Sequence, residues 1–179
     1  GLIVVCKRQP ALSRLAEYFR KRTIDREYSA IVWWRFPTDS GTIDEPIGRD
    51  IHDRKKYAIS PRGKSAVTHW KLIENFDFMA HVSVKLETGR THQIRVHLGA
   101  KGHPIFGDQE YGGRNRQIGK LSSAQRNEVG SYLQAVSRQM LHARVLGFVH
   151  PITREKLHFE VEPPEDYMQL LNKLKEQNM

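Results

Sequence analysis

The feature that most constrains the fold of this chain is the order of its strand-like and helix-like runs. Strands are predicted where β-branched, aromatic or alternating apolar residues gather: 1–6, 28–34, 66–73, 80–86, 144–150 and 156–161. Helices are predicted where apolar residues recur at helical spacing: from Pro10, 92–101, from Ser122, and 165–175. The strands come in runs separated by single helices, without strict βαβ alternation. This order predicts an α+β fold with a mixed, largely antiparallel sheet and flanking helices.

Several element ends carry their own signals. Thr91 is expected to cap the helix at 92–101, and Gly102 to end it in the left-handed conformation. Ser122 and Gln125 have the spacing of a capping box. Residues 37–41 are predicted to be a loop, and 48–63 a polar, basic excursion with short pairings.

Composition describes an ordinary globular protein. The chain has 179 residues, 39% of them hydrophobic and 27% charged, with no linker or repeat, so we expect one domain over 1–179. No apolar run approaches the roughly 18 residues that a membrane span needs, and no signal peptide is visible. A single cysteine, Cys6, excludes an intrachain disulfide and suits a reducing compartment, so we expect a cytoplasmic protein.

The charge is basic and unevenly distributed. The net charge is +9, and residues 49–71 hold seven Lys or Arg against two acids, while 85–126 hold eight against three. Such an excess favours a polyanionic partner, and nucleic acid is the first candidate, although many basic proteins merely carry solvated lysines.

The densest polar chemistry lies in 88–97, Thr-Gly-Arg-Thr-His-Gln-Ile-Arg-Val-His, with the Gly/Pro loop 102–108 shortly after it. On a helix, His92, Arg95 and Gly99 share one face, and Ile94 and Leu98 lie roughly opposite. We therefore expect the two apolar residues to pack inward and Arg95 to point into a cleft. An arginine there is permanently charged, and its planar fork suits a carboxylate or a phosphate; the alternative is a surface arginine lying over apolar neighbours.

This stretch, extended by Gln109-Glu110-Tyr111-Gly112-Gly113, closely resembles the arginine-containing signature of the RluA-type pseudouridine synthases, which isomerise uridine within RNA. The resemblance implies the pseudouridine synthase fold, and it gives Arg95 the role of the arginine that pairs with the catalytic aspartate. In that family the aspartate lies in a His-Arg-Leu-Asp-x-x-Thr-Ser-Gly motif that runs into an apolar strand, and residues 1–7 resemble the end of that motif without its aspartate. We therefore expect an N-terminally incomplete domain that is inactive alone, with Arg95 unpaired or holding a solvent anion.

Tyr28 opens a predicted strand, and from the residues alone it reads as a sheet tyrosine with its hydroxyl in water. The segment Arg26-x-Tyr28-x-Ala30-x-Val32 resembles the second signature of the same family. That resemblance makes Tyr28 a catalytic residue that stacks on the flipped base and helps to move a proton. We expect Tyr28 and Arg95 to face one hollow, and the resemblance implies no cofactor and no metal.

A set of basic and polar residues is expected to hold the RNA: Arg54, Lys55, Lys56, Arg62, Lys64, Arg90, Thr91, His92, Gln93 and Arg114. For His92 and Gln93, bracing of the helix is an equally good reading. Gly89 is expected to need a positive φ. His97, His103 and Asp108 are expected to be structural, and the histidine spacing does not suit a metal site.

Three functions stay open at this point. The first is an RNA pseudouridine synthase, acting as a monomer on structured RNA, with ribosomal RNA favoured over transfer RNA. The second is a non-catalytic RNA-binding module, and the third is an assembly protein that uses its basic face on ribosomal RNA. An aspartate about five residues before Gly1 in the parent protein favours the enzyme.

Overall fold

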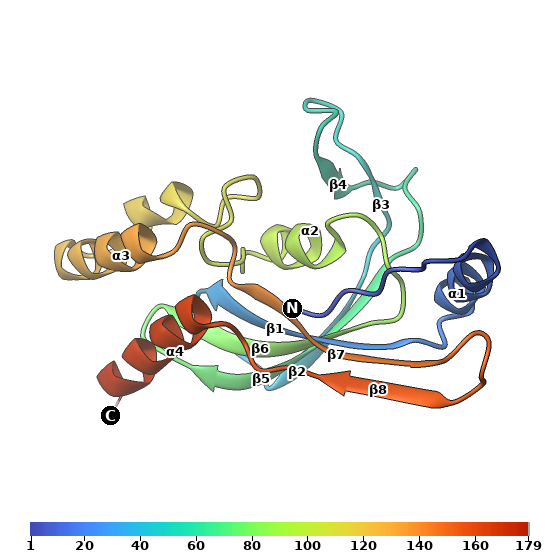
Figure 1. Cartoon of the computed structure of the whole chain (residues 1–179). Coiled ribbons are helices and arrows are strands. Elements are labelled where there is room, and N and C mark those ends of the chain that lie inside the picture. Colours follow the sequence, from blue (N-terminus) through green and yellow to red (C-terminus); the bar gives the residue numbers. More distant parts are fainter. Residues whose placement is uncertain (179) are drawn as a thin grey trace.

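A computed structural model describes residues 1–178, and its centre is a six-stranded sheet (Figure 1). The strand order is β2-β5-β6-β1-β7-β8, and each neighbouring pair is antiparallel. The strands are β1 (Asp25–Trp33), β2 (Ser40–Asp44), β5 (Val67–Asn75), β6 (Met79–Leu86), β7 (Leu141–Val149) and β8 (Lys156–Glu160). The expectation of an α+β fold with a largely antiparallel sheet is confirmed, and no parallel pair occurs within 1–178.

Two further strands, β3 (Ile47–Arg49) and β4 (Tyr57–Ile59), pair with each other in a hairpin that projects from the sheet (Figure 1). This hairpin is the predicted pairing within 48–63. The loop predicted at 37–41 ends earlier, because Ser40 and Gly41 begin β2 and pair with Lys71 and Trp70 of β5. The pairing partner of this strand is remote in sequence, so local composition did not reveal it.

The two faces of the sheet are covered by different helices. Alternate residues of β1 point to opposite faces. Ala30 and Val32 pack in one apolar cluster with Ile94 and Leu98 of α2 (Gln93–Ala100). Ile31 and Trp33 belong to the cluster of α3 (Ser123–Ala135) and α4 (Glu165–Gln177). The inward packing expected for the apolar side of α2 is confirmed.

The capping predictions are partly correct. Ser122 and Gln125 form the expected capping box at the start of α3, and Gly102 has a φ of +86° after α2. Thr91 does not cap α2: the residue before the helix is His92, with φ 56° and no side-chain cap. A short 3₁₀-helix, η1 (Asn115–Lys120), lies between α2 and α3.

The expectation of a doubly buried strand at 1–6 is wrong. Residues 1–6, here called the N-terminal segment, are extended, with Leu2, Val4 and Cys6 packed against Leu15, Ile24 and Leu146. The alternate residues Ile3 and Val5 are 84% and 78% exposed. One backbone hydrogen bond, from the Leu2 N–H to the Ala143 carbonyl, ties the segment to β7, but the segment is not one of the six strands of the sheet.

The helix predicted from Pro10 is α1 (Gln9–Lys21), with proline in its first turn and Leu15 buried. It lies at the N-terminal end of β1, and its Leu12 and Phe19 side chains are partly exposed. Within 1–178, no helix has the length and apolarity to cross a membrane. The same residues contain no group of three His, Cys, Asp or Glu side chains arranged to hold a metal ion.

Candidate active site and RNA interface

Tyr28 lies in β1 at a break in the strand pairing. Glu27 pairs with Val145 of β7, but Tyr28 pairs with Ala143, so one residue of β7 bulges out. A bulge locally bends and twists the strands and redirects nearby side chains. Tyr28 therefore stands at the edge of the apolar cluster under α2, beside an irregular part of the sheet.

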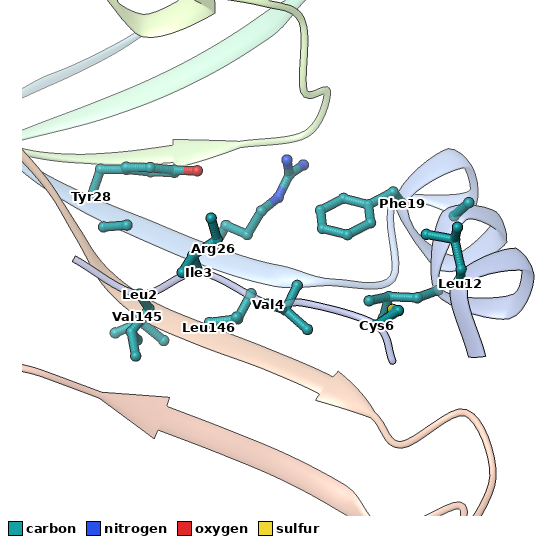
Figure 2. Close-up of a pocket in the computed structure, with 13 residues that line it drawn as sticks. Leu2, Ile3, Val4, Cys6, Leu12, Phe19, Arg26, Tyr28, Val145 and Leu146 are labelled. Carbon is teal, nitrogen blue, oxygen red and sulfur yellow. The ribbon is translucent and has the colours of Figure 1, made fainter. Parts of the chain in front are cut away.

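A cavity of about 360 Å³ opens beside the Tyr28 ring (Figure 2). We call it the tyrosine cavity. Its walls come from the N-terminal segment, α1, β1 and β7, and most of them are apolar, including Leu12, Phe19 and Leu146. Burial raises the pKa of the Tyr28 hydroxyl, and the positive charge of Arg26 partly opposes this rise. The site thus offers a neutral phenol and apolar walls to a flat ligand.

Arg26 is the charged residue of this cavity. It precedes Tyr28 by two residues on the same face of β1, and both side chains border the same space in Figure 2. The side chain is 8% exposed, and burial lowers the pKa of its guanidinium. The sequence motif contains Arg26, but the motif alone assigns it no role. The sequence did hold one indication: Arg26 and Tyr28 are two residues apart on a strand, so their side chains point to the same face.

Arg95 is not the unpaired cation that the sequence predicted. Its Nε and Nη2 donate to the two oxygens of Asp108, each over 2.7 Å, and Nη2 also donates to Glu110 over 2.6 Å. Burial lowers the pKa of Arg95, but the hydrogen bonds and charges of Asp108 and Glu110 outweigh it and leave the pKa above its ordinary value. Arg95 does not line the tyrosine cavity, so the expected shared hollow with Tyr28 is wrong.

Asp108 is the reason for this arrangement. Its carboxylate is fully buried and also accepts hydrogen bonds from the backbone N–H groups of Glu110 and Tyr111. The bracing role expected for Asp108 is therefore correct. The loop after Gly102 turns the chain back along α2 and supplies Arg95 with a partner from the same chain. A catalytic role of Arg95 stays a prediction.

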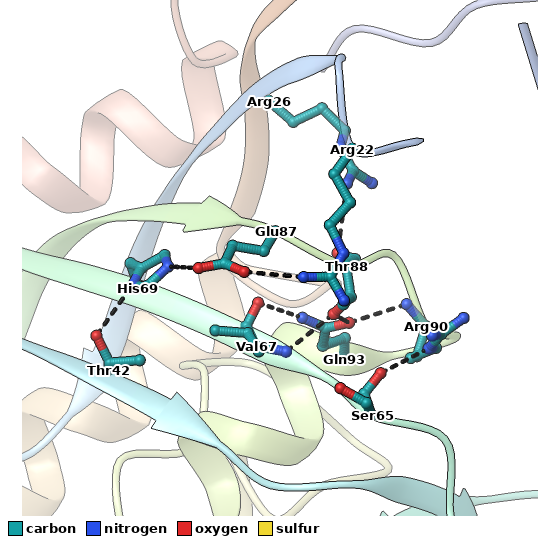
Figure 3. Close-up of polar contacts among 10 residues, drawn as sticks. All are labelled: Arg22, Arg26, Thr42, Ser65, Val67, His69, Glu87, Thr88, Arg90 and Gln93. Carbon is teal, nitrogen blue, oxygen red and sulfur yellow. Dashed lines mark hydrogen bonds and ion pairs between the residues drawn. The ribbon is translucent and has the colours of Figure 1, made fainter. Parts of the chain in front are cut away.

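The signature loop, residues 87–91, is held to β5 by Gln93 (Figure 3). Gln93 is 2% exposed; its oxygen accepts from the Thr88 hydroxyl and the Arg90 N–H, and its amide donates to the Val67 carbonyl. These bonds leave Gln93 no free group to offer RNA. The bracing interpretation of Gln93 is confirmed, and its contact with RNA stays a prediction that these bonds do not favour.

Gly89 is required for a different reason than a positive φ, which it does not have. A Cβ at this position would lie 2.6 Å from Nη1 of Arg26. Arg26 also donates from Nη2 to the Thr88 carbonyl over 3.3 Å. The glycine of the signature therefore makes room for the arginine of the tyrosine cavity.

A second cavity, of about 460 Å³, is lined in part by Gly89, Arg90 and Thr91 of the signature loop; we call it the basic cavity. It brings together four of the predicted RNA-binding residues, Arg62, Lys64, Arg90 and Thr91. Two residues that the sequence analysis did not select complete it, Arg49 and Tyr57, with the guanidinium of Arg49 4.4 Å from the Tyr57 ring centre. Gly89 lines this cavity and lies next to Arg26, which lines the tyrosine cavity, so the two cavities are close to each other.

The remaining predicted contacts are distributed differently. Arg54, Lys55 and Lys56 lie in the turn between β3 and β4, outside the basic cavity. Arg114 donates to the carbonyls of Leu133 and Val136 at the end of α3, so its guanidinium is structural and the RNA interpretation is not supported. His92 is half-buried and bonded through Nδ1 to the Tyr111 hydroxyl over 2.8 Å, which is a bracing contact.

The other expected structural histidines behave as predicted. His97 is fully buried, with its two ring nitrogens bonded to the Thr68 hydroxyl and the Glu45 carbonyl. His103 stacks on Phe36, with ring centres 3.8 Å apart. Both side chains join α2 and the loop after it to the sheet.

The antiparallel sheet and the Thr-Gly-Arg loop are those of a known family: this chain belongs to the RNA pseudouridylate synthase family, whose model matches residues 1–100. Among its relatives, ribosomal large subunit pseudouridine synthase D of Vibrio vulnificus is 43% identical over 175 residues, which cover 98% of this chain and 52% of that protein. The protein of the same name from Escherichia coli is 42% identical over 171 residues, covering 96% and 51%.

Solved structures agree on the fold. Human RNA pseudouridylate synthase domain containing 4 superposes with a TM-score of 0.72 at 27% identity, covering 94% of this chain and 69% of that one. Human RNA pseudouridylate synthase domain containing 1 superposes with a TM-score of 0.67 at 24% identity, covering 94% and 73%. The chain spans about half the length of the curated relatives it matches.

Proposed function

We propose that this chain carries the greater part of one catalytic domain of a pseudouridine synthase that acts on ribosomal RNA. The observation that carries the proposal is the tyrosine cavity, where a phenol, apolar walls and a buried cation meet. The relatives named for the ribosomal large subunit support ribosomal RNA as the substrate. In this proposal the enzyme is monomeric and meets its RNA in the cytoplasm.

The proposed reaction is an isomerisation within one nucleotide. The N1–C1′ bond of uridine breaks, uracil turns, a C5–C1′ bond forms, the C5 proton leaves to solvent, and N1 takes up a proton in exchange. No electrons are gained or lost, which agrees with a reaction without cofactor or metal. A stacked base is unreachable, so the nucleotide is flipped out of the RNA, at a cost of a few kcal/mol.

Tyr28 serves two steps in this proposal. Its ring stacks on the flipped uracil, and the apolar walls of the tyrosine cavity exclude water from the base. Its hydroxyl then passes the C5 proton towards solvent. The raised pKa keeps the phenol protonated, so it relays a proton as a neutral group rather than as a phenolate.

The reaction also needs an ionised carboxylate near C1′ or C2′, and among residues 1–178 no acid lines the tyrosine cavity. We propose that this group is the aspartate of the family motif, in the part of a longer protein that precedes Gly1. The Leu2 N–H donates to the Ala143 carbonyl over 2.9 Å, and Ala143 pairs with Tyr28. A preceding segment would therefore start beside β7, at the residue that pairs with Tyr28 of β1.

The basic cavity is the proposed grip on the RNA backbone. Arg62 and Lys64 approach from the β3–β4 side, and Arg90 from the signature loop. Contacts to phosphates fix the RNA in register without reading its sequence, and they offset the cost of flipping. The proximity of the two cavities fits a flipped base in one and its flanking backbone in the other.

Tritium release from ribosomal RNA labelled at uridine C5 tests the proposal. A protein of the relatives' length should release tritium, and its Tyr28→Phe variant should bind the RNA but release little. An absence of release from the longer protein, with RNA binding intact, would instead support the second candidate, a non-catalytic RNA-binding module, which the cavity's lack of a carboxylate within 1–178 favours.

A further inference from the structure

Arg26 is a buried cation without an acidic partner. Its side chain is 8% exposed inside β1, and no ion pair joins it to any acid among residues 1–178. A buried charge is normally paired or fully hydrogen-bonded, because desolvation costs several kcal/mol. Arg26 therefore requires an explanation that the fold alone does not supply.

The hydrogen bonds of Arg26 are incomplete. Nη2 donates to the Thr88 carbonyl over 3.3 Å, which is a long bond, and the buried Nε–H has no partner in the described part of the chain. The guanidinium carbon lies 5.2 Å from the Phe19 ring centre, a contact that offsets only part of the desolvation. Arg26 also lines the open tyrosine cavity, so a ligand oxygen there can accept from the Nη N–H groups that no acceptor among residues 1–178 engages.

The acids of the chain that lie nearby are engaged elsewhere. Glu27 points to the other face of β1, where it pairs with Lys85 and Arg144. Glu87 of the signature loop binds Arg22 and His69 (Figure 3). The negative charge that would satisfy Arg26 must therefore arrive from outside these residues.

We propose that Arg26 binds a phosphate of the RNA nucleotide whose base stacks on Tyr28, an inference that rests on the proposed function. Residues two apart on a strand are about 7 Å apart, so the guanidinium and the phenol ring stand side by side on one wall (Figure 2). A nucleotide presents a flat base and a phosphate with a similar separation. The planar guanidinium fork matches a phosphate and forms charge-assisted hydrogen bonds.

Charge and packing favour a phosphate as this anion. The cavity walls formed by residues 1–178 hold no acid, and the chain carries a net charge of +9, so a polyanion is drawn towards the site. Gly89 makes room for the Arg26 guanidinium, because a Cβ at position 89 would lie 2.6 Å from Nη1 of Arg26. The signature loop is thus shaped around the donor that we assign to the phosphate.

The binding test compares uridine 5′-monophosphate with uridine by calorimetry on this chain. The wild type should bind the monophosphate about tenfold or more tightly, as one charge-assisted contact allows. Arg26→Gln should abolish this preference, and Arg26→Lys should restore part of it. Arg20→Gln, the same charge change on an exposed side chain of α1, is the matched control and should keep the preference.

Several outcomes would overturn the inference. Equal binding of uridine and its monophosphate to the wild type would do so, as would an undiminished preference in Arg26→Gln. Because Arg26→Gln can also disturb packing, Gly89→Ala serves as a second variant that moves the guanidinium without removing it; it should weaken the monophosphate preference. If acetate displaces the monophosphate as effectively as inorganic phosphate does, the site binds a carboxylate instead.

The proposed function is judged separately. In the longer protein, Arg26→Gln should raise KM for the RNA more than it lowers kcat, if Arg26 holds the backbone. Full tritium release with an unchanged KM would remove Arg26 from the site and leave the isomerase proposal intact. No tritium release from the longer wild type would remove the isomerase proposal, and the monophosphate comparison would still decide the role of Arg26.

Discussion

Arg95 donates two hydrogen bonds of 2.7 Å to the Asp108 carboxylate, from Nε to Oδ2 and from Nη2 to Oδ1. The carboxylate is fully buried and the arginine side chain is 11% exposed, so water screens this pair little. The pair joins α2 to the loop after it, and the Arg95 guanidinium also lies 4.6 Å from the Tyr111 ring centre. A large part of the polar chemistry in the signature therefore holds the fold.

We expect Asp108→Asn to lower the free energy of unfolding by about 3 kcal/mol, because it leaves a mostly buried arginine with one partner. Urea unfolding measures this change. Lys101→Gln breaks the exposed pair with Glu45 and is the control, with an expected loss below about 1 kcal/mol. Equal losses in the two variants would mean that the Arg95–Asp108 pair contributes no more than a surface pair.

Tyr28→Phe should lower kcat of the longer protein about 100-fold or more, because it removes the proton-transfer group but keeps the stacking ring. RNA affinity, measured by filter binding, should stay close to that of the wild type. Tyr28→Ala should lose both properties, since base stacking contributes about 1–3 kcal/mol. Tyr18→Phe is the control tyrosine, outside the cavity lining, and should leave both unchanged.

Gly89→Ala should change stability by less than about 1 kcal/mol, because the atom it meets is the end of a flexible side chain. It should nevertheless reduce activity of the longer protein, since the Arg26 guanidinium must move. Gly130→Ala, at a helical position with open space, should instead stabilise the protein by about 1 kcal/mol. Thermal unfolding and tritium release together separate the two effects.

Lys64→Gln should weaken RNA binding and make the dependence of log K on log salt shallower by about 0.7 to 0.9, the value for one lost phosphate contact. Arg114→Gln removes the same charge from a side chain that binds the carbonyls at the end of α3. It should lower stability and leave the salt slope unchanged. A reduced slope in Arg114→Gln alone would reverse our assignment of these two residues.

His81 should make the fold sensitive to acid. It is buried against the Ser29 hydroxyl at 2.7 Å, and burial, with smaller effects of Lys175 and Arg144, lowers its pKa from 6.5 to about 4. Because the unfolded state binds the proton more tightly, this group costs stability only below about pH 6.5. The loss grows until about pH 4 and reaches about 3 kcal/mol.

The measurement for His81 is urea unfolding at pH 7.5 and pH 4.5. The difference between the two pH values should be smaller in His81→Gln than in the wild type. His158→Gln, at an exposed position of β8, should keep the wild-type difference. Identical pH dependence in all three proteins would show that His81 is protonated without cost in the folded state.

The sequence by itself determined the elements whose signals are local. The strands from Tyr28, Ala66 and Ala80, the capping box at Ser122 and the terminal helix from Glu165 need only the periodicity and capping chemistry of their own residues. The same is true of the family, because its signature is a contiguous run. The motif around Tyr28 was enough to predict that this residue borders a cavity, as it does.

Only the tertiary structure decided which charges are free. The Arg95 guanidinium is bonded to Asp108, and the Gln93 amide is bonded to the first residue of β5. Arg26, to which the sequence assigned no role, has a donor without a partner within the described residues. The physical reason is that a guanidinium or an amide takes its role from partners that are remote in the chain. Sequence spacing fixes the direction of a side chain along its own strand or helix, but not what the rest of the fold brings to meet it.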